Sequence, residues 1–302
     1  FLYYSCLGYM LSLIRNHNLF DILLDKSLTA ERLKKYDVLI LPNSACLNEK
    51  ERETIKDFVR NGGNLIASFE TGFYDEKGCP VADAEWESLL GIEKVEGLFP
   101  CYITGNYLMA KESFAGFEKG QLIESPAYSL RVKARDGIQT PLFHMKPLKT
   151  YYMPLEGISD SPALLMGKYG KGKVVYCPAS FESLYGEYRI DSPSKIINSL
   201  VDKMSPGNML KVQAPASVEV EVYYQKKESR YIIHLINCTG DMQRPIEEII
   251  PVFNIRISLK AGRVKNVYRL SDKKPVVFST KEGVTGFSVP ELNFYEVIVA
   301  ET

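Results

Sequence analysis

The sequence predicts an open parallel α/β sheet domain followed by an antiparallel β-sandwich. Strand–helix units alternate from residue 19 to about residue 92 and return at 173–204, which is typical of a parallel sheet covered by helices. After residue 206 helical periodicity is absent, and short strands with turn residues between them follow. Because 302 residues exceed most single cores, we expect two domains, residues 1–205 and 206–302.

The first elements follow from apolar spacing. Leu7, Met10, Leu11 and Ile14 recur at helical intervals, which predicts one amphipathic helix near the N-terminus. A short strand is expected at 20–24 and a brief helix at 27–35. Residues 37–42 read Asp-Val-Leu-Ile-Leu-Pro, an almost wholly apolar strand of the kind that a sheet covered on both faces requires.

The next elements carry explicit start and stop signals. Asn48 followed by Glu51 predicts a capping box that opens a helix, and Gly62-Gly63 predicts its end, since glycine adopts the left-handed cap conformation without steric cost. A strand is expected at 64–68 and a helix at 83–90.

The remaining chain divides into an insertion, a closing strand–helix unit and the sandwich. Residues 93–170 are rich in Gly, Pro and aromatic residues and are interpreted as an insertion of strands and loops. A strand at 173–177 and a helix at 192–204 complete the first domain. Strict alternation at 218–222 and a core-like strand at 231–237 open the second.

Composition and charge exclude several classes of function. The chain has 37 Lys+Arg and 37 Asp+Glu, so it lacks the basic field that nucleic-acid binding needs and gives no reason to expect a membrane partner. Six cysteines without a C-x-x-C pair favour reduced thiols and a cytoplasmic location, without settling the compartment. A neutral carbohydrate ligand stays open.

Several stretches together resemble a known module. They are Tyr-Asp-Val-Leu-Ile-Leu-Pro-Asn at 36–43, Phe-Val-Arg-Asn-Gly-Gly-Asn-Leu-Ile-Ala at 58–67, Glu-Thr-Gly-Phe-Tyr-Asp at 70–75 and Tyr-Gly-Lys-Gly-Lys-Val-Val-Tyr at 169–176. The chain is similar to the glutamine-amidotransferase-like "trimerisation" domain, with its C-terminal β-sandwich, of β-galactosidases and related glycoside hydrolases. The similarity of the sandwich strands rests on Val218 and on His-Leu-Ile-Asn at 234–237.

The resemblance implies a fold, a context and partners. It implies a flavodoxin-like (class I glutamine-amidotransferase-like) parallel sheet, and an upstream (β/α)₈ barrel of the same protein that carries the catalytic carboxylates. It also implies a homo-oligomer, with a trimer as the expected form. Phe1 starts too late to supply the strand that usually opens such a domain, so we interpret the chain as part of a longer protein.

Active amidotransferases of this fold place a cysteine on the turn after the strand that corresponds to 64–68. Here Glu70 occupies the nucleophile-like position, so glutamine hydrolysis is not expected. Glu70 is either a ligand or interface carboxylate or, as the sequence favours, a structural turn carboxylate. Cys46 is either a displaced nucleophile paired with His144 or His234, or, as favoured, a semi-buried loop thiol.

Aromatic residues in loops supply further ligand or interface candidates, because a flat ring can stack on a sugar. Tyr185 and Tyr188 are the preferred pair, with Tyr74 beside Glu70. Other candidates are Phe73, Tyr102, Tyr107, Tyr151 and Tyr152. The spacing of the histidines gives no support to a metal site, so we predict no metal in this chain. We also predict no catalytic residue and no cofactor.

The function predicted from the sequence is a non-catalytic accessory and oligomerisation region of a β-galactosidase-like glycoside hydrolase. Two alternatives remain at this point. One is an autonomous hydrolase of the amidotransferase superfamily that uses Cys46, and the other is a carbohydrate-binding module.

Overall fold

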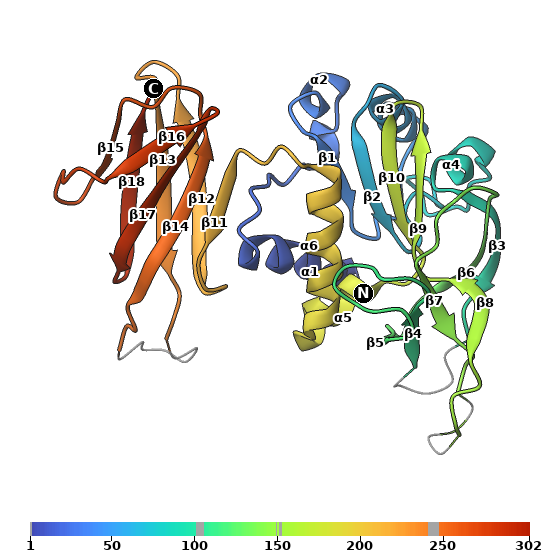
Figure 1. Cartoon of the computed structure of the whole chain (residues 1–302). Helices are drawn as coiled ribbons and strands as arrows, with labels where there is room; N and C mark the ends of the chain where they lie inside the picture. Colours follow the sequence, from blue (N-terminus) through green and yellow to red (C-terminus); the bar gives the residue numbers. More distant parts are fainter. Residues whose placement is uncertain (1, 101–105, 149, 151–152, 241–247) are drawn as a thin grey trace. The chain divides into compact units, whose positions relative to one another are not determined.

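The structure is a computed structural model that describes residues 2–100, 106–148, 150, 153–240 and 248–302 (Figure 1). Its internal contacts divide the chain into two compact units. The first comprises residues 1–10 and 22–205, and the second residues 11–21 and 206–302. None of the helices in the described ranges combines the length and the apolar character that crossing a membrane would need.

The central sheet of the first unit has four strands. They are β1 (Val38–Leu41), β2 (Asn64–Ser68), β10 (Gly172–Cys177) and β9 (Leu165–Tyr169), in the order β1-β2-β10-β9. β1 and β10 pair in parallel with β2, whereas β9 pairs antiparallel with β10. The parallel strands are short runs of apolar side chains, as expected where helices cover both faces.

Helix α3 (Glu49–Arg60) shows how local signals set the elements around this sheet. The Asn48 side chain accepts a hydrogen bond from the Glu51 N–H, and the Glu51 side chain accepts one from the Asn48 N–H. This reciprocal capping box satisfies two backbone donors that a helix start leaves free. The chain turns away after Asn61 at Gly62, whose φ of 116° favours glycine.

The two faces of the sheet bury different side chains. Leu65 of β2 belongs to one core together with Ile55 of α3 and Trp86 of α4 (Ala84–Leu89). Ile66 and Val175 alternate to the opposite face and are also fully buried. The other helical segments are α1 (Leu2–Arg15), the 3₁₀ turn η1 (Asp25–Ser27), α2 (Ala30–Leu33), α5 (Phe181–Tyr188) and α6 (Asp191–Met204).

The insertion consists of two small antiparallel sheets. One pairs β3 (Ile92–Leu98) with β6 (Leu130–Ala134). The other has the order β5-β4-β7-β8, formed by β4 (Tyr107–Ala110), β5 (Leu122–Glu124), β7 (Leu142–Met145) and β8 (Ile158–Pro162).

The predicted fold class is wrong, because the first unit is not a flavodoxin-like, amidotransferase-like parallel sheet domain. Only β1, β2 and β10 pair in parallel, and every other described strand of this unit lies in antiparallel pairs. The strand expected at 20–24 does not form. Its apolar residues Ile22 and Leu24 are 61% and 71% exposed in irregular structure, so they add no strand to the sheet.

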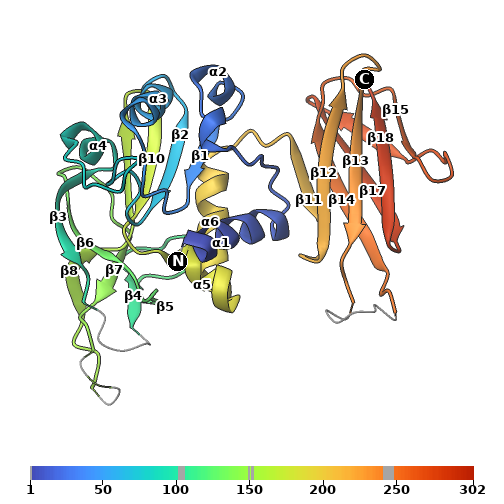
Figure 2. The same ribbon diagram turned by 180° about the vertical axis from the view of Figure 1, so that it is seen from behind.

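The second unit contains two four-stranded antiparallel sheets (Figure 2). One has the order β11-β14-β17-β16, formed by β11 (Leu210–Gln213), β14 (Val252–Lys260), β17 (Val284–Leu292) and β16 (Phe278–Lys281). The other has the order β12-β13-β18-β15, formed by β12 (Val218–Gln225), β13 (Arg230–Asn237), β18 (Tyr295–Glu301) and β15 (Asn266–Arg269). Ile257 of the first sheet and Leu235 of the second share one core, as in a sandwich.

Candidate functional site

The carboxyl ends of β1 and β2 are each followed by a residue in a strained backbone conformation. Asn43 and Phe69 adopt positive φ values of 45° and 50°, which side chains other than glycine rarely do. Hydrogen bonds hold both turns: the Asn43 N–H donates to Ser68 Oγ (3.1 Å) and the Tyr176 hydroxyl donates to the Phe69 carbonyl (2.6 Å). The Glu70 N–H donates to Asn43 Oδ1 (3.3 Å), which joins the two strand ends.

Glu70 and Tyr74 meet at this edge. The Tyr74 hydroxyl donates to Glu70 Oε1 at 3.1 Å, and the charge of Glu70 raises the pKa of Tyr74. Both side chains are half-buried, and the exposed Cys46 forms a β-bridge with Tyr74. The structure therefore brings together three residues singled out in the sequence, and it provides one partly open carboxylate next to a phenol.

The hydrolase alternative needs a histidine beside the Cys46 thiol. His144 Nε2 lies 2.8 Å from Ser129 Oγ, its ring stacks on Phe99 at 4.1 Å, and burial lowers its pKa to about 3. His234 belongs to the second unit, where Nδ1 lies 2.6 Å from the Tyr295 hydroxyl. Each of the two histidines is thus engaged within its own unit, His144 by Ser129 and Phe99 and His234 by Tyr295, and the described geometry gives the hydrolase alternative no support.

A second carboxyl, Glu182 of α5, lies fully buried behind the strand ends. Its Oε1 accepts hydrogen bonds from the hydroxyls of Ser68 (2.8 Å) and Ser180 (2.9 Å), while Oε2 has no hydrogen-bond partner among the described residues. Burial raises the pKa of Glu182, although the serine hydroxyls oppose this. A ligand cannot reach this group, so its role concerns stability rather than binding.

Tyr185 and Tyr188 do not form the expected ligand-facing pair. Tyr185 is only 6% exposed, whereas Tyr188 is 63% exposed at the end of α5. Tyr185 lies within α5, whereas Tyr188 is its last residue, directly before Arg189 in the left-handed backbone conformation that ends the helix. Of the other aromatic candidates, Tyr102, Tyr151 and Tyr152 lie outside the described residues.

Tyr188 instead contributes to a surface made by α1 and α5. The two helices can approach closely because glycine has no Cβ at either point of contact. A Cβ on Gly8 would lie only 1.9 Å from the Glu182 carbonyl oxygen, and one on Gly186 only 2.0 Å from the Tyr4 carbonyl oxygen. This crossing leaves a set of exposed apolar side chains at the start of α1 and the end of α5. We call it the tyrosine surface, and it consists of Leu2, Tyr3, Tyr4 and Tyr188.

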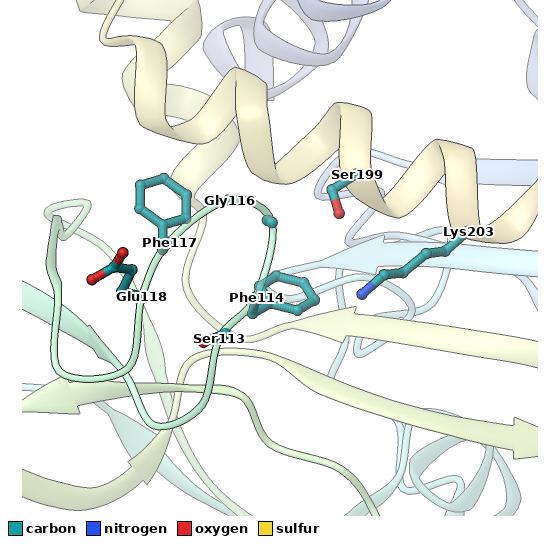
Figure 3. A pocket seen from close by; sticks show the side chains of 8 residues that line it. Ser113, Phe114, Gly116, Phe117, Glu118, Ser199 and Lys203 are labelled. Atoms are coloured by element: carbon teal, nitrogen blue, oxygen red, sulfur yellow. The ribbon is translucent and has the colours of Figure 1, made fainter.

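A hollow of about 420 Å³ lies between the turn at 113–118 and helix α6 (Figure 3). Lys203 extends toward Phe114, with Nζ 4.5 Å from the ring centroid, and Glu118 lies on the opposite side of the turn. Phe114 and Phe117 are buried, so they offer no open ring face to a ligand. The hollow therefore has the character of a surface groove and supplies no catalytic pair.

In the sequence His234 stood out only as a partner for Cys46 and as part of a sandwich strand, and Tyr223 and Tyr295 of the second unit were not singled out. The rings of Tyr223 and His234 meet edge to face at 5.6 Å, and those of His234 and Tyr295 lie 5.9 Å apart. The available signal was the alternation along β13, where Ile233 and Leu235 are buried and His234 therefore points to the other face. Within the described part of the chain, no cluster of three or more His, Cys, Asp or Glu could hold a metal ion.

Comparison with known proteins places this geometry in context. Residues 18–102 match the family model of the β-galactosidase trimerisation domain. A search of curated proteins finds no match.

Three solved structures are similar in fold. An α-L-fucosidase isoenzyme 2 from Paenibacillus thiaminolyticus has a TM-score of 0.76 at 20% identity, over 97% of this chain and 44% of that one. A catalytic mutant of Gan42B, a GH42 β-galactosidase from G. stearothermophilus, has a TM-score of 0.65 at 17% identity, over 98% and 35%. A β-galactosidase from Bacillus circulans sp. alkalophilus has a TM-score of 0.66 at 16% identity, over 97% and 36%.

The chain thus spans less than half the length of each of these structures. At these identities the likeness concerns the fold, while the family model adds a match in sequence over residues 18–102. Together they confirm that the chain resembles the C-terminal region of β-galactosidase-like glycoside hydrolases, which carries the trimerisation domain.

Proposed function

We propose that this chain is a non-catalytic accessory region that assembles a glycoside hydrolase into a homo-oligomer, with a trimer as the expected form. The observation that carries the proposal is the match of residues 18–102 to a trimerisation domain. In this proposal the chain forms two domains, residues 1–205 and 206–302. A (β/α)₈ barrel upstream in the same protein carries the catalysis.

The chemistry of the strand-end site supports a role without catalysis. Glycosidases use two carboxyl groups that flank the scissile bond. Here Glu70 is the one carboxylate of the partly open site described above, and its partner is the hydroxyl of Tyr74. Glu182 lies on the buried side, where water and a sugar cannot reach it. A hydrolytic pair would have to come from another part of the protein.

The tyrosine surface supplies a contact face for a second copy of the chain. Tyr3 and Tyr188 are 68% and 63% exposed, and the rings of Tyr3 and Tyr4 pack edge to face at 5.4 Å. Tyrosine is enriched in interface cores because it buries a large area and retains a polar end. Since the surface lies on the unit that contains most of residues 18–102, a second copy is the occupant that we propose for it.

The substrate of the parent enzyme is proposed to be a neutral glycoside. The chain has equal numbers of acidic and basic residues, and the similar structures include β-galactosidases and an α-L-fucosidase. Hydrolysis of nitrophenyl β-D-galactoside and nitrophenyl α-L-fucoside by the protein that contains this chain would distinguish the two sugars.

Sedimentation velocity tests the assembly role directly. We expect the chain to sediment as a trimer at micromolar concentration, and the double variant Tyr3→Asp/Tyr188→Asp to sediment as a folded monomer. Val277→Asp is the matched control, because Val277 is 93% exposed in the second unit and lies outside the tyrosine surface. A monomeric wild-type chain would contradict the assembly role, and a trimeric double variant would contradict the choice of surface.

A further inference from the structure

We propose that the outer face of the β12-β13-β18-β15 sheet binds neutral pyranosides on an aromatic platform formed by Tyr223, His234 and Tyr295. The three side chains lie on adjacent strands, with His234 at the centre of β13. Glu221 of β12 is directly opposite His234 in the strand register, and Ile236, two residues along β13, is opposite Tyr295 of β18. The platform therefore runs diagonally across three strands, which are within reach of aromatic side chains.

His234 and Tyr295 form a nearly parallel pair of rings. Their planes are 26° apart and their centroids 5.9 Å apart, while His234 Nδ1 and the Tyr295 hydroxyl are only 2.6 Å apart. The hydrogen bond therefore holds the two rings in this nearly parallel arrangement.

Tyr223 supplies the third ring of the platform. Its ring is 88° from that of His234, at a centroid distance of 5.6 Å. Its hydroxyl donates to Glu221 Oε2 at 3.0 Å, which fixes the ring, and this hydrogen bond together with the charge of Glu221 raises the pKa of Tyr223. Two nearly parallel rings with a third ring perpendicular to His234 are an arrangement that can orient a ring-shaped ligand.

The exposure of the platform shows that its faces are available. Tyr223 and Tyr295 are 56% and 49% exposed, although both could have been packed in a sandwich of this size. Among the described residues, the cation–π contacts involve other rings, so no lysine or arginine covers these three. Exposed rings that are held by hydrogen bonds lose little conformational entropy on binding, which favours recognition.

The chemistry of the platform selects the ligand class. The face of an aromatic ring is electronegative and attracts the polarised C–H groups that line one face of a pyranose. The hydroxyls of Tyr223 and Tyr295 and the carboxylate of Glu221 can pair with the sugar hydroxyls at the rim. Glu221 and Asp21 both act electrostatically on Tyr223, so the site repels phosphate and carboxylate groups and disfavours nucleic acids and acidic sugars.

This inference uses the glycoside context of the proposed function only to choose the probes. Saturation-transfer difference NMR with lactose and methyl α-L-fucoside tests it on the whole chain. We expect saturation of the sugar ring protons with millimolar affinity, and at least tenfold weaker binding for Tyr295→Ala and for Tyr223→Ala. Phe253→Ala is the matched control, because Phe253 is an exposed aromatic residue of β14 in the other sheet. It should bind as the wild type does.

Two outcomes would overturn the platform. One is the absence of saturation transfer to both sugars from the wild-type chain, and the other is unchanged binding by the folded Tyr295→Ala and Tyr223→Ala variants. Far-ultraviolet circular dichroism confirms the folding of each variant. Sedimentation of the same samples separates this inference from the assembly role, since loss of the platform leaves the oligomer intact.

Discussion

Ser68 at the end of β2 and Glu182 in the first turn of α5 are joined by a 2.8 Å hydrogen bond in which the serine hydroxyl donates to the carboxyl. The bond ties a strand end, whose next residue has a strained backbone, to a helix on the buried side of the sheet. Cys6 and Tyr9 of α1 and Cys177 of β10 lie near this carboxyl, and the pKa of each is raised by burial first and by the charge of Glu182 in addition. Glu182 is thus the titratable centre of a dry cluster.

The Glu182 cluster predicts a pH dependence of stability. Because burial raises the pKa of Glu182 in the folded state, its protonated form is favoured there. Its contribution to stability is full below the pKa of the unfolded chain and is lost as the pH rises through the folded-state value. We expect Glu182→Gln, which mimics the protonated form, to gain stability relative to wild type as the pH rises from 5 to about 8.

Urea midpoints at several pH values measure this effect. Glu187→Gln is the matched control, because Glu187 is an exposed carboxylate on the same helix. A constant difference between wild type and Glu182→Gln across the pH range would show that Glu182 does not titrate there.

Truncation of Lys56 in α3 is expected to lower the free energy of unfolding strongly. Its side chain is 2% exposed, and Nζ donates to Asp83 at 2.9 Å and to Glu53 at 2.8 Å. Asp83 also accepts a hydrogen bond from the Trp86 N–H and so caps α4. Lys56→Ala leaves a partly buried carboxylate with a weaker partner, and we expect a loss of about 2–3 kcal/mol.

Chemical denaturation of Lys56→Ala beside Lys50→Ala checks this value. Lys50 is exposed on the same helix, so its removal should change stability by less than about 0.5 kcal/mol. Equal losses in the two variants would refute the role of the buried ion pair.

Features that depend on residues close together in the sequence could be predicted, whereas features that depend on distant residues could not. The capping box of Asn48 and Glu51 and the stop at Gly62 involve neighbours in the chain, and all are present in the structure. The apolar residues Ile22 and Leu24 are typical of a strand, but a strand forms only where it pairs with another strand, which here would be distant in sequence. None forms, and the number of parallel strands was therefore overestimated.

The candidate site shows the same limit. Glu70, Tyr74 and Cys46 follow strands that were correctly placed, so their proximity could be expected from adjacent strand ends. Tyr223, His234 and Tyr295 come together only through the register of β12, β13 and β18. The alternation along β13 indicates which face His234 takes, but the residues of β12 and β18 that lie beside it depend on the pairing between strands distant in sequence.

His144 is predicted to remain neutral across the physiological range. Burial lowers its pKa to about 3, whereas the unfolded chain has a histidine pKa near 6.5. The free energy of unfolding therefore decreases as the pH falls below about 6.5, and this loss grows until about pH 3, up to about 5 kcal/mol. NMR titration of the imidazole protons should show no midpoint for His144 above pH of about 5.

His144→Gln assigns the resonance and supplies the control. The urea midpoint of this variant should also change less steeply with pH than that of the wild type between about pH 4 and 6.5. A His144 midpoint near that of an ordinary histidine would mean that the contact with Ser129 and Phe99 opens in solution.

Gly186 links the fold of the first unit to its proposed assembly. A methyl group there would lie 2.0 Å from the Tyr4 carbonyl oxygen, and backbone cannot yield as a flexible side chain can. Gly186→Ala must therefore push α1 away from α5, at a cost of about 3 kcal/mol. Because α1 and α5 carry Tyr3 and Tyr188, the same variant should weaken the oligomer in sedimentation.

Gly207→Ala is the control, since its methyl group would meet only the far end of Lys260 at 4.0 Å. A destabilised but fully trimeric Gly186→Ala would separate the helix crossing from the interface and place the contact between copies elsewhere on the chain.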